Sequence, residues 1–258
     1  MRLSVIVIAL NEADNIQACL ESVAFADERI VLDGGSMDAT AQIARDCGAV
    51  VAVHQPWEGF GPQKNRALAM AQGQGVLSLD ADERVSEALA REIQTVIASA
   101  ESVAYEIPRS TQFCGQWIRH CGWTPDRVLR LFQNGQAAFT NDQVHERLVS
   151  SAQRPFQRVE RLQSPLLHYS YPTPSHYWRK LQSYSLAWAQ QRHAMGQTTS
   201  MARAAASGVA AFLRSYFLRL GFLDGAMGFA VCTMQAQGAF GKYFTLYCLS
   251  RQRAEDTL

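Results

Sequence analysis

The strongest constraint on the fold is the alternation of apolar runs with helical patterns over the first 80 residues. Buried strands are predicted at residues 3–10, 29–32, 49–54 and 76–79. Helices are predicted between them, at residues 15–23, after residue 36, and at residues 63–71. Strands that alternate with helices favour a parallel sheet with right-handed crossovers, covered by helices on both faces. We therefore expect an α/β fold.

The last of these strands ends in two acids that stand one residue apart. Residues 75–84 have the sequence G-V-L-S-L-D-A-D-E-R, in which the apolar run stops at Asp80 and Asp82. Ligands of open parallel sheets bind beyond the carboxyl ends of the strands. Two carboxylates there form a hard oxygen site, which suits Mg²⁺ or Mn²⁺ holding a diphosphate. The alternative is that both acids only cap the next helix, but Ser86 is already well placed as its N-cap.

Polar residues also follow two of the other strands. Asn11 and Glu12 follow the first strand and Asp33 ends the second, so three strand ends point to one crevice. The sequence has no G-x-G-x-x-G after its first strand and no G-x-x-x-x-G-K-[ST], which argues against a dinucleotide-binding Rossmann domain and a P-loop. A nucleotide can still bind there, with Asp33 accepting from a base edge and the metal taking the phosphates. Ser36 is expected to cap the helix that follows Asp33.

Composition excludes several other classes of protein. The 24 basic and 23 acidic residues give a net charge of +1, so no overall field would attract nucleic acid. The six cysteines form no C-x-x-C pair and no zinc spacing, which indicates reduced thiols in the core. No run of about 18 uncharged apolar residues occurs, so no transmembrane helix is expected.

The pattern changes after residue 100. Short strands at residues 103–108, 128–132, 137–140 and 166–169 predict a mixed extension of the sheet. A helix is predicted from the prolines at 172 and 174 to about residue 193. Residues 201–249 are apolar, interrupted by glycine, and richer in basic than in acidic residues. This tail forms either a pair of core-packing helices or an amphipathic segment in a membrane interface, where basic residues meet anionic head groups.

Four motifs occur in a characteristic order along the first 84 residues. They are S-V-I-V-I-A-L-N-E (4–12), V-L-D-G-G-S-M-D-A-T (31–40), G-P-Q-K-N-R-A-L (61–68) and L-D-A-D-E-R (79–84). Together they resemble the inverting family 2 glycosyltransferases of GT-A fold. W-E-G-F (57–60), R-V-L-R-L-F (127–132) and V-H-E-R-L (144–148) make the chain more closely similar to bacterial lipopolysaccharide core β-1,4-glucosyltransferases.

The resemblance implies a domain organisation. It implies a GT-A type, Rossmann-like parallel or mixed sheet flanked by helices, followed by a C-terminal helical, amphipathic appendage. Residues 1–170 would form the catalytic domain, with a nucleotide-sugar half at 1–100 and an acceptor half at 101–170. Residues 171–258 would form the helical region, with a possible attachment to a membrane surface.

The resemblance also implies donor-side roles, position by position. The loop that wraps the nucleoside corresponds here to Leu10, Asn11 and Glu12. Asp33 matches the residue that reads the uracil. A cation facing the diphosphate is expected from Lys64 or Arg66, although a solvated helix face is an equally good interpretation of both.

Metal binding is implied at the D-x-D motif formed by Asp80, Ala81 and Asp82. Asp82 is expected as the direct ligand of Mg²⁺ or Mn²⁺, with Asp80 nearer to the ribose. His168, at the end of a predicted strand, matches a further ligand of some relatives. The metal would neutralise the charge that builds on the leaving nucleotide.

An inverting transferase needs one general base to deprotonate the acceptor hydroxyl. In V-H-E-R-L, Glu146 stands where the acceptor-side acid of the resembling group is found, and the resemblance implies that it is the base. Asp142 is the alternative, because the E-D pair that often supplies the base in this family is absent here.

The implied activity is metal-assisted, inverting transfer of a hexose, glucose from UDP-glucose, to a heptose of the lipopolysaccharide inner core. The expected partners are a UDP-sugar, a lipid-linked core acceptor and the membrane surface, with no nucleic acid. The expected location is cytoplasmic and peripheral, on the inner face of the cytoplasmic membrane. The alternatives are sugar transfer to a polyprenyl phosphate or another polysaccharide, and a non-catalytic nucleotide-sugar binder. An acceptor phosphate is already anionic and needs no base.

Overall fold

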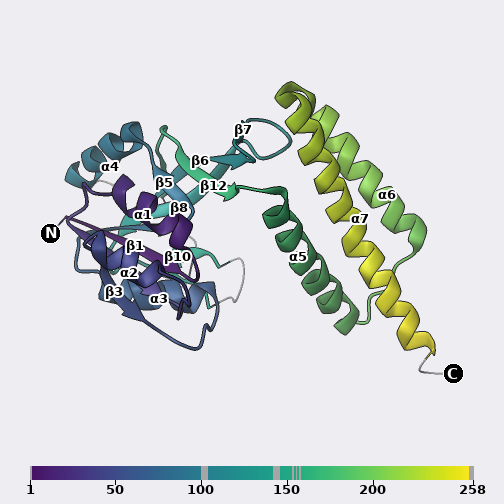
Figure 1. The fold of residues 1–258 in the computed structure, drawn as a ribbon, viewed down its shortest axis with the longest axis horizontal. Helices are drawn as coiled ribbons and strands as arrows, with labels where there is room; N and C mark the ends of the chain where they lie inside the picture. Colours follow the sequence, from purple (N-terminus) through teal and green to yellow (C-terminus); the bar gives the residue numbers. More distant parts are fainter. Residues whose placement is uncertain are drawn as a thin grey trace. The chain divides into compact units, whose positions relative to one another are not determined.

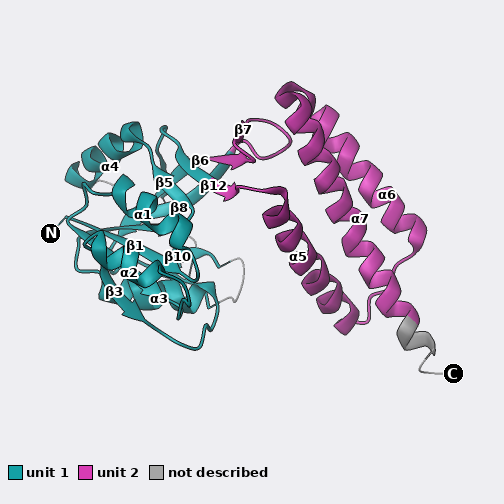
Figure 2. Ribbon diagram, in the orientation of Figure 1, with its two compact units in different colours: residues 1–109, 126–168 teal, residues 110–125, 169–258 magenta. Residues whose placement is uncertain are grey.

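The computed structural model describes residues 2–99, 104–141, 146–152, 154, 156 and 158–255 (Figure 1). The chain divides into two compact units (Figure 2). The first unit holds residues 1–109 and 126–168, and the second holds residues 110–125 and 169–258. Residues 110–125, which the sequence places in the acceptor half, thus group with the C-terminal helices.

The first unit opens with the predicted alternation of strands and helices. Its elements are β1 (Leu3–Ala9), α1 (Ala13–Ser22), β2 (Glu28–Asp33), α2 (Thr40–Asp46), β3 (Val50–Val53), α3 (Phe60–Met70) and β4 (Gly75–Asp80). The strands are parallel and lie in the order β3-β2-β1-β4. Because all four strands run the same way, the carboxyl ends of β1, β2 and β4 meet at one edge of the sheet.

Further strands, most of them antiparallel to their neighbours, extend this sheet beyond β4, and the predicted mixed extension is confirmed. The order continues β4-β8-β6-β12-β5, and β11 and the short β7 (Gln116–Ile118) pair with β6. Two further strands form a separate antiparallel pair, β9 with β10. The elements are β5 (Glu83–Val85), α4 (Glu87–Ser99), β6 (Ala104–Phe113), β8 (Asp126–Gln133), β9 (Ala137–Phe139), β10 (Leu148–Ser150), β11 (Glu160–Arg161) and β12 (Leu166–Tyr171). Both β6 and β12 run from the first unit into the second.

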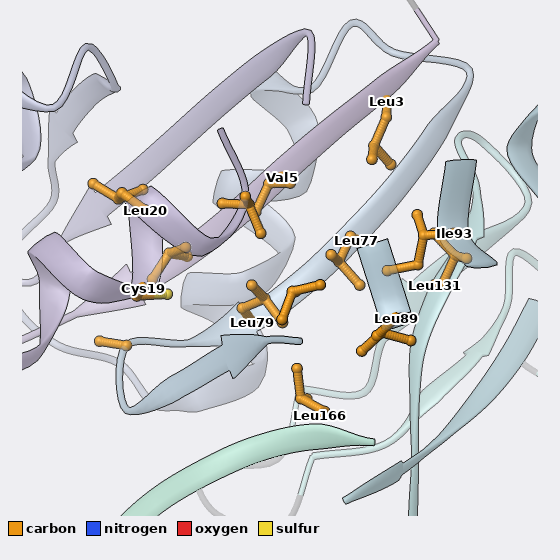
Figure 3. Packing of buried hydrophobic residues seen from close by; sticks show 14 of the residues in the cluster. Leu3, Val5, Cys19, Leu20, Leu77, Leu79, Leu89, Ile93, Leu131 and Leu166 are labelled. Atoms are coloured by element: carbon orange, nitrogen blue, oxygen red, sulfur yellow. The ribbon is translucent and has the colours of Figure 1, made fainter. Parts of the chain in front are cut away.

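Both faces of the sheet are buried, which explains the unbroken apolar run of β1. Successive strand residues point to opposite faces. Val5 and Val7 join a cluster with side chains of α1 and α4, among them Leu20 and Leu89 (Figure 3). Ile6 and Ile8 join the cluster on the other face, which includes α3. The Ser86 hydroxyl accepts from Leu89 N at 3.2 Å, so the predicted cap of α4 is confirmed.

The second unit is mainly helical. Its elements are the short β7 (Gln116–Ile118), α5 (Pro174–Ala194), α6 (Met201–Leu213), the π-helix η1 (Arg214–Leu218), the 3-10 helix η2 (Gly221–Asp224) and α7 (Gly225–Glu255). The predicted helix at 174–193 is confirmed by α5. A Cβ on Gly208 of α6 would lie 3.2 Å from Phe240 Cβ of α7, so glycine allows these two helices to approach closely.

Among the described residues, no single helix is long and apolar enough to cross a membrane. The bent pair formed by Met201–Leu218 and Gly221–Arg251 meets the same criteria of length and composition when both parts are taken together. The two parts meet at an angle of 73°.

Candidate active site

Two loops interlock at the carboxyl ends of β1 and β2. Asn11, with a positive φ of 55°, donates its backbone N–H to Ser36 Oγ at 2.8 Å. Its Oδ1 accepts from Met37 N at 2.9 Å. Ser36 therefore links the two loops, and its predicted role as a helix cap is wrong, because α2 begins only at Thr40. Asparagine suits this position because its short polar side chain tolerates the left-handed region.

Asp33 shapes the loop that follows β2. Its side chain is 2% exposed. Oδ2 accepts from the N–H groups of Gly35 at 3.1 Å and Ser36 at 2.9 Å, and Oδ1 accepts from Ser36 Oγ at 2.5 Å. The carboxylate therefore holds the loop from within, and its predicted contact to a uracil stays a prediction.

The rest of the predicted nucleoside loop combines an apolar side chain with anchored backbone. Leu10 is 40% exposed. Glu12 donates its backbone N–H to Thr40 Oγ1 at 2.8 Å, and its Oε2 accepts from Asn15 Nδ2 at 2.8 Å. Residues 10–12 thus form a fixed loop with Leu10 as its apolar surface.

Two glycines after β2 leave room for large side chains from the loop before α3. A Cβ on Gly34 would lie 2.5 Å from Cε3 of Trp57. Gly35 has a φ of +92°, and a Cβ there would overlap the side chain of Gln55. Both positions therefore require glycine, and Trp57 lies directly beside the Asp33 loop.

Asp80, at the end of β4, is held between two cations. Lys64 Nζ lies 2.9 Å from Asp80 Oδ1, and Arg130 of β8 pairs with Oδ2. Burial alone would raise the pKa of Asp80, but the charges of Arg130 and Lys64 and their hydrogen bonds outweigh it and hold the pKa well below its ordinary value of 3.8. Lys64 is 2% exposed, so it does not lie on a solvated helix face.

Lys64 also contacts the predicted base. Its Nζ lies 2.7 Å from Glu146 Oε1, while the Glu146 side chain is 14% exposed. The ammonium group also lies 5.6 Å from the ring centroid of Phe139. A single buried nitrogen thus joins the predicted donor-side acid to the predicted acceptor-side base.

Asn65, which the sequence did not single out, fixes the position of α3 beside this contact. Its Nδ2 donates to Phe139 O at 2.8 Å, and its Oδ1 accepts from Phe139 N at 2.8 Å. This pair of bonds binds α3 to the backbone of Phe139, the last residue of β9. The only sequence signal was its place next to Lys64 in the motif G-P-Q-K-N-R-A-L.

Glu83 is a second residue that sequence reasoning missed. It is 0% exposed and accepts from Asp80 N at 3.0 Å, Arg130 at 2.9 Å and Arg109 at 3.3 Å. Arg109 in turn lies 2.7 Å from Asp126. Burial would lower the pKa of Arg130, but the charges of Asp80 and Glu83 raise it instead. The D-x-D strand end therefore rests on a buried chain of ion pairs.

Asp82 faces His168 across the end of the sheet. Asp82 Oδ2 and His168 Nε2 lie 3.3 Å apart, with the side chains 18% and 13% exposed. The antiparallel register of β5 with β12 sets this pair, because His168 stands opposite Glu83. Ala81 between the two acids is 4% exposed. Within the described part of the chain, no group of three or more His, Cys, Asp or Glu side chains could hold a metal.

Arg66 is not brought to this cluster. Arg66 pairs with Glu58 in the loop before α3, and its side chain is 33% exposed. Asp142, the alternative base, lies outside the described residues.

Comparison with known proteins defines the family. Residues 4–158 match the model of glycosyl transferase family 2. The chain belongs to this family. It is therefore a glycosyltransferase, and its mixed sheet flanked by helices, followed by a C-terminal helical region, confirms the predicted GT-A type fold.

The alignments with related proteins cover most of this glycosyltransferase. A Rickettsia typhi protein described as an uncharacterized glycosyltransferase is 30% identical, over 88% of this chain and 80% of its own. The lipopolysaccharide core biosynthesis glycosyltransferase LpsC of Rhizobium meliloti is 29% identical, over 99% of this chain and 97% of its own. Among solved structures, S. aureus TarS 1-349 in complex with UDP is 15% identical with a TM-score of 0.49, over 99% of this chain and 92% of its own.

The cluster in this glycosyltransferase separates two kinds of carboxylate. Asp80 forms ion pairs with Lys64 and Arg130. Glu83 forms ion pairs with Arg109 and Arg130. Asp82 instead lies beside a histidine, a residue that can bind a metal through a neutral ring nitrogen. The arrangement therefore offers cationic support on one side of the strand end and metal-type ligands on the other.

Proposed function

We propose that this protein transfers a hexose, glucose from UDP-glucose, with inversion to a heptose hydroxyl of the lipopolysaccharide inner core. The observation that carries the proposal is the position of Lys64 Nζ, 2.9 Å from Asp80 and 2.7 Å from Glu146. An inverting transfer needs the leaving group and the base on either side of one sugar carbon. Lys64, a buried cation shared by Asp80 and Glu146, would hold the proposed base at a fixed distance from the strand end where the leaving diphosphate would lie.

The donor nucleotide would lie along the strand ends. Residues 10–12 and the Asp33 loop would surround the nucleoside, with Trp57 beside them. Lys64 contacts Asp80 of the D-x-D motif and would also face a diphosphate oxygen, because its ammonium group carries three donors. Arg130 would stay behind Asp80 and hold its carboxylate in place.

A divalent metal fits Asp82 and His168 better than Asp80, whose two oxygens already contact Lys64 and Arg130. Mg²⁺ is commonly held by one or two protein ligands together with substrate phosphates and water. Bound there, Mg²⁺ or Mn²⁺ would supply Lewis-acid stabilisation of the departing diphosphate. The residues of the chain then position the donor and exclude water around it.

Glu146 would take the proton of the acceptor hydroxyl. Its carboxylate is partly buried and held through Oε1 by Lys64, which fixes its direction while the other oxygen can accept the proton. An acceptor phosphate would need no such group, so the placement of Glu146 favours transfer to a hydroxyl over transfer to a polyprenyl phosphate.

The acceptor and the location rest on relatives and composition. LpsC, whose name assigns it to lipopolysaccharide core biosynthesis, matches 99% of this chain. Such an acceptor is lipid-linked, so the enzyme would work at the inner face of the cytoplasmic membrane as a peripheral protein. The basic, apolar C-terminal unit suits attachment to that surface.

Glu146→Gln tests the proposal most directly. With labelled UDP-glucose, Mg²⁺ or Mn²⁺ and a core-lipid acceptor, we expect the variant to lose transfer by about a hundredfold or more, because no group takes the proton. Glu87→Gln, an exposed change in the first turn of α4, is the matched control and should keep the wild-type rate.

Product linkage analysis identifies the sugar, the acceptor position and the anomer. Full activity of Glu146→Gln would show that another group is the base. Transfer to a polyprenyl phosphate that survives the substitution, without transfer to core lipid, would favour the alternative acceptor. Chelation of the divalent metal should abolish transfer, and activity that persists in chelator would contradict the metal-assisted mechanism.

A further inference from the structure

The turn that joins α6 to α7 lies at the end of α7 opposite to the C-terminus (Figure 1). This turn carries several exposed leucines and phenylalanines. Leu218 is 81% exposed, Leu223 57% and Phe217 53%. We name the exposed apolar residues of this turn the turn patch: Leu213, Phe217, Leu218, Leu220, Phe222 and Leu223. A contiguous apolar surface on a folded protein marks an interaction site.

Hydrogen bonds and close packing fix the backbone beneath the turn patch. Asp224, 8% exposed, accepts from the N–H groups of Arg119 at 3.2 Å and His120 at 2.8 Å, and from His120 Nδ1 at 2.8 Å. A Cβ on Gly228 would lie 1.9 Å from Gly221 O, so η2 packs directly against the start of α7. The turn is therefore tied to the β7–β8 connection and to α7.

Aromatic contacts keep the patch side chains outward. The ring of Tyr216 contacts Phe217 at 5.2 Å, Phe222 at 6.1 Å and Phe229 at 5.9 Å between centroids. Leu220 has a left-handed φ of 54°, a conformation that costs energy in a residue with a Cβ and persists only where the surroundings impose it. The backbone of the turn is therefore held by its surroundings in a strained conformation at Leu220, within the patch.

The charge of the second unit, which carries the patch, favours an anionic partner. The second unit contains ten Lys and Arg residues against three Asp and Glu, a net charge of +7, although the whole chain carries +1. From residue 110 to 125 and from 169 to 251 the sole acid is Asp224, which is buried and paired with His120. Arg214 and Arg219 are exposed within the turn itself.

We propose that the turn patch inserts into the interface of a bilayer with anionic head groups. Its leucines and phenylalanines enter the acyl boundary, while Arg214 and Arg219 pair with lipid phosphates. A second copy of the chain fits this surface poorly, because two units of charge +7 repel each other. The inference deepens the proposed function, since it names the surface by which the transferase meets the membrane that carries its acceptor.

The insertion is shallow. If the bent pair of helices entered the bilayer with the turn leading, Arg214 and Arg219 would reach the greatest depth. Arginine at the bilayer centre is costly unless it reaches the interface or a polar partner. At the level of the head groups the same two side chains instead strengthen binding, because they meet anionic phosphates.

Vesicle binding by the full-length protein tests this inference. We compare neutral phosphatidylcholine vesicles with vesicles that contain about 30 mol % phosphatidylglycerol. Leu218→Asp with Leu223→Asp should lower partition into anionic vesicles by about tenfold or more, because two apolar side chains are lost and two negative charges are added. Arg214→Glu should lower it by about tenfold.

The matched control is Val50→Asp with Val53→Asp on β3, where both valines are more than half exposed, at 55% and 56%. This variant should bind like the wild type. Thermal unfolding and transfer to a water-soluble core oligosaccharide should be unchanged in the turn variants, since Leu218 and Leu223 point to solvent.

Four results would overturn the inference. Turn variants that bind as well as the wild type would place the membrane surface elsewhere and leave the proposed function intact. If the wild type binds no anionic vesicle, the proposed membrane attachment is wrong. Transfer to the soluble acceptor then still tests the proposed reaction. Retention after alkaline carbonate extraction would show deep insertion. A dimer that the turn substitutions dissociate would identify a second copy of the chain as the partner.

Discussion

At the scale of single residues, Glu83 shows how the end of β4 depends on a buried carboxylate outside that strand. Its carboxylate is fully buried and contacts two arginines and the backbone of Asp80. Removing one partner of a buried ion pair leaves the other charge uncompensated, which is far more costly than breaking an exposed pair.

We therefore expect Glu83→Gln to lower the free energy of unfolding by about 3–5 kcal/mol in urea titrations. Arg130 and Arg109 would then face only Asp80 and Asp126. Glu58→Gln, which breaks the exposed pair with Arg66, is the control and should leave the stability nearly unchanged. Equal effects of the two substitutions would show that the buried chain of ion pairs adds nothing.

At the scale of elements, the start of β1 is fixed by a carboxylate outside the strand. Asp27 Oδ2 accepts from Arg2 N and Leu3 N, each at 2.9 Å. The hydrogen bond from Leu3, followed by that from Arg2, holds the pKa of Asp27 below its ordinary value of 3.8. A depressed pKa means that the stabilisation is present above pH 3.8 and is lost as the pH falls through the lower, folded value.

Asp27→Asn should therefore destabilise the protein at neutral pH and make little difference in strong acid. Unfolding midpoints of the wild type and the variant, measured from pH 7 downward, should converge below pH 3.8. A difference that stays constant across this range would mean that the ionised carboxylate is not responsible.

The sequence predicted the strands and their ends better than it predicted contacts between distant side chains. The apolar runs of β1, β2 and β4, and the acids after them, predicted the strand ends because buried parallel strands have few alternatives. The contacts of Lys64 with Asp80 and Glu146 were not predictable in this way. They depend on how β9 and its flanking residues meet α3, and local pattern carries no information on such distant pairs. The prediction that Ser36 caps a helix was wrong for a related reason. The Ser36 hydroxyl accepts from the backbone N–H of Asn11, a residue far away in the sequence.

At the scale of the whole molecule, buried and exposed charges respond differently to salt. The ion pairs around Asp80 are shielded from solvent, whereas the basic residues of the second unit are largely exposed. Ions screen exposed charges much more than buried ones.

Raising NaCl from about 50 mM to about 300 mM should therefore reduce transfer to an acceptor in anionic vesicles but leave transfer to a soluble core oligosaccharide nearly constant. Neutral vesicles are the control for effects of salt on the lipid. Parallel losses with both acceptors would indicate that salt acts on the catalytic unit itself.

Strand β12 connects the two units of the chain directly. His168 is the last residue of the first unit, and Tyr169, the next residue on the same strand, already belongs to the second. A force on the second unit would therefore reach the histidine beside Asp82 through a single peptide bond. In the proposed enzyme, anchored by its helices, such a force would act on a residue of the proposed metal site.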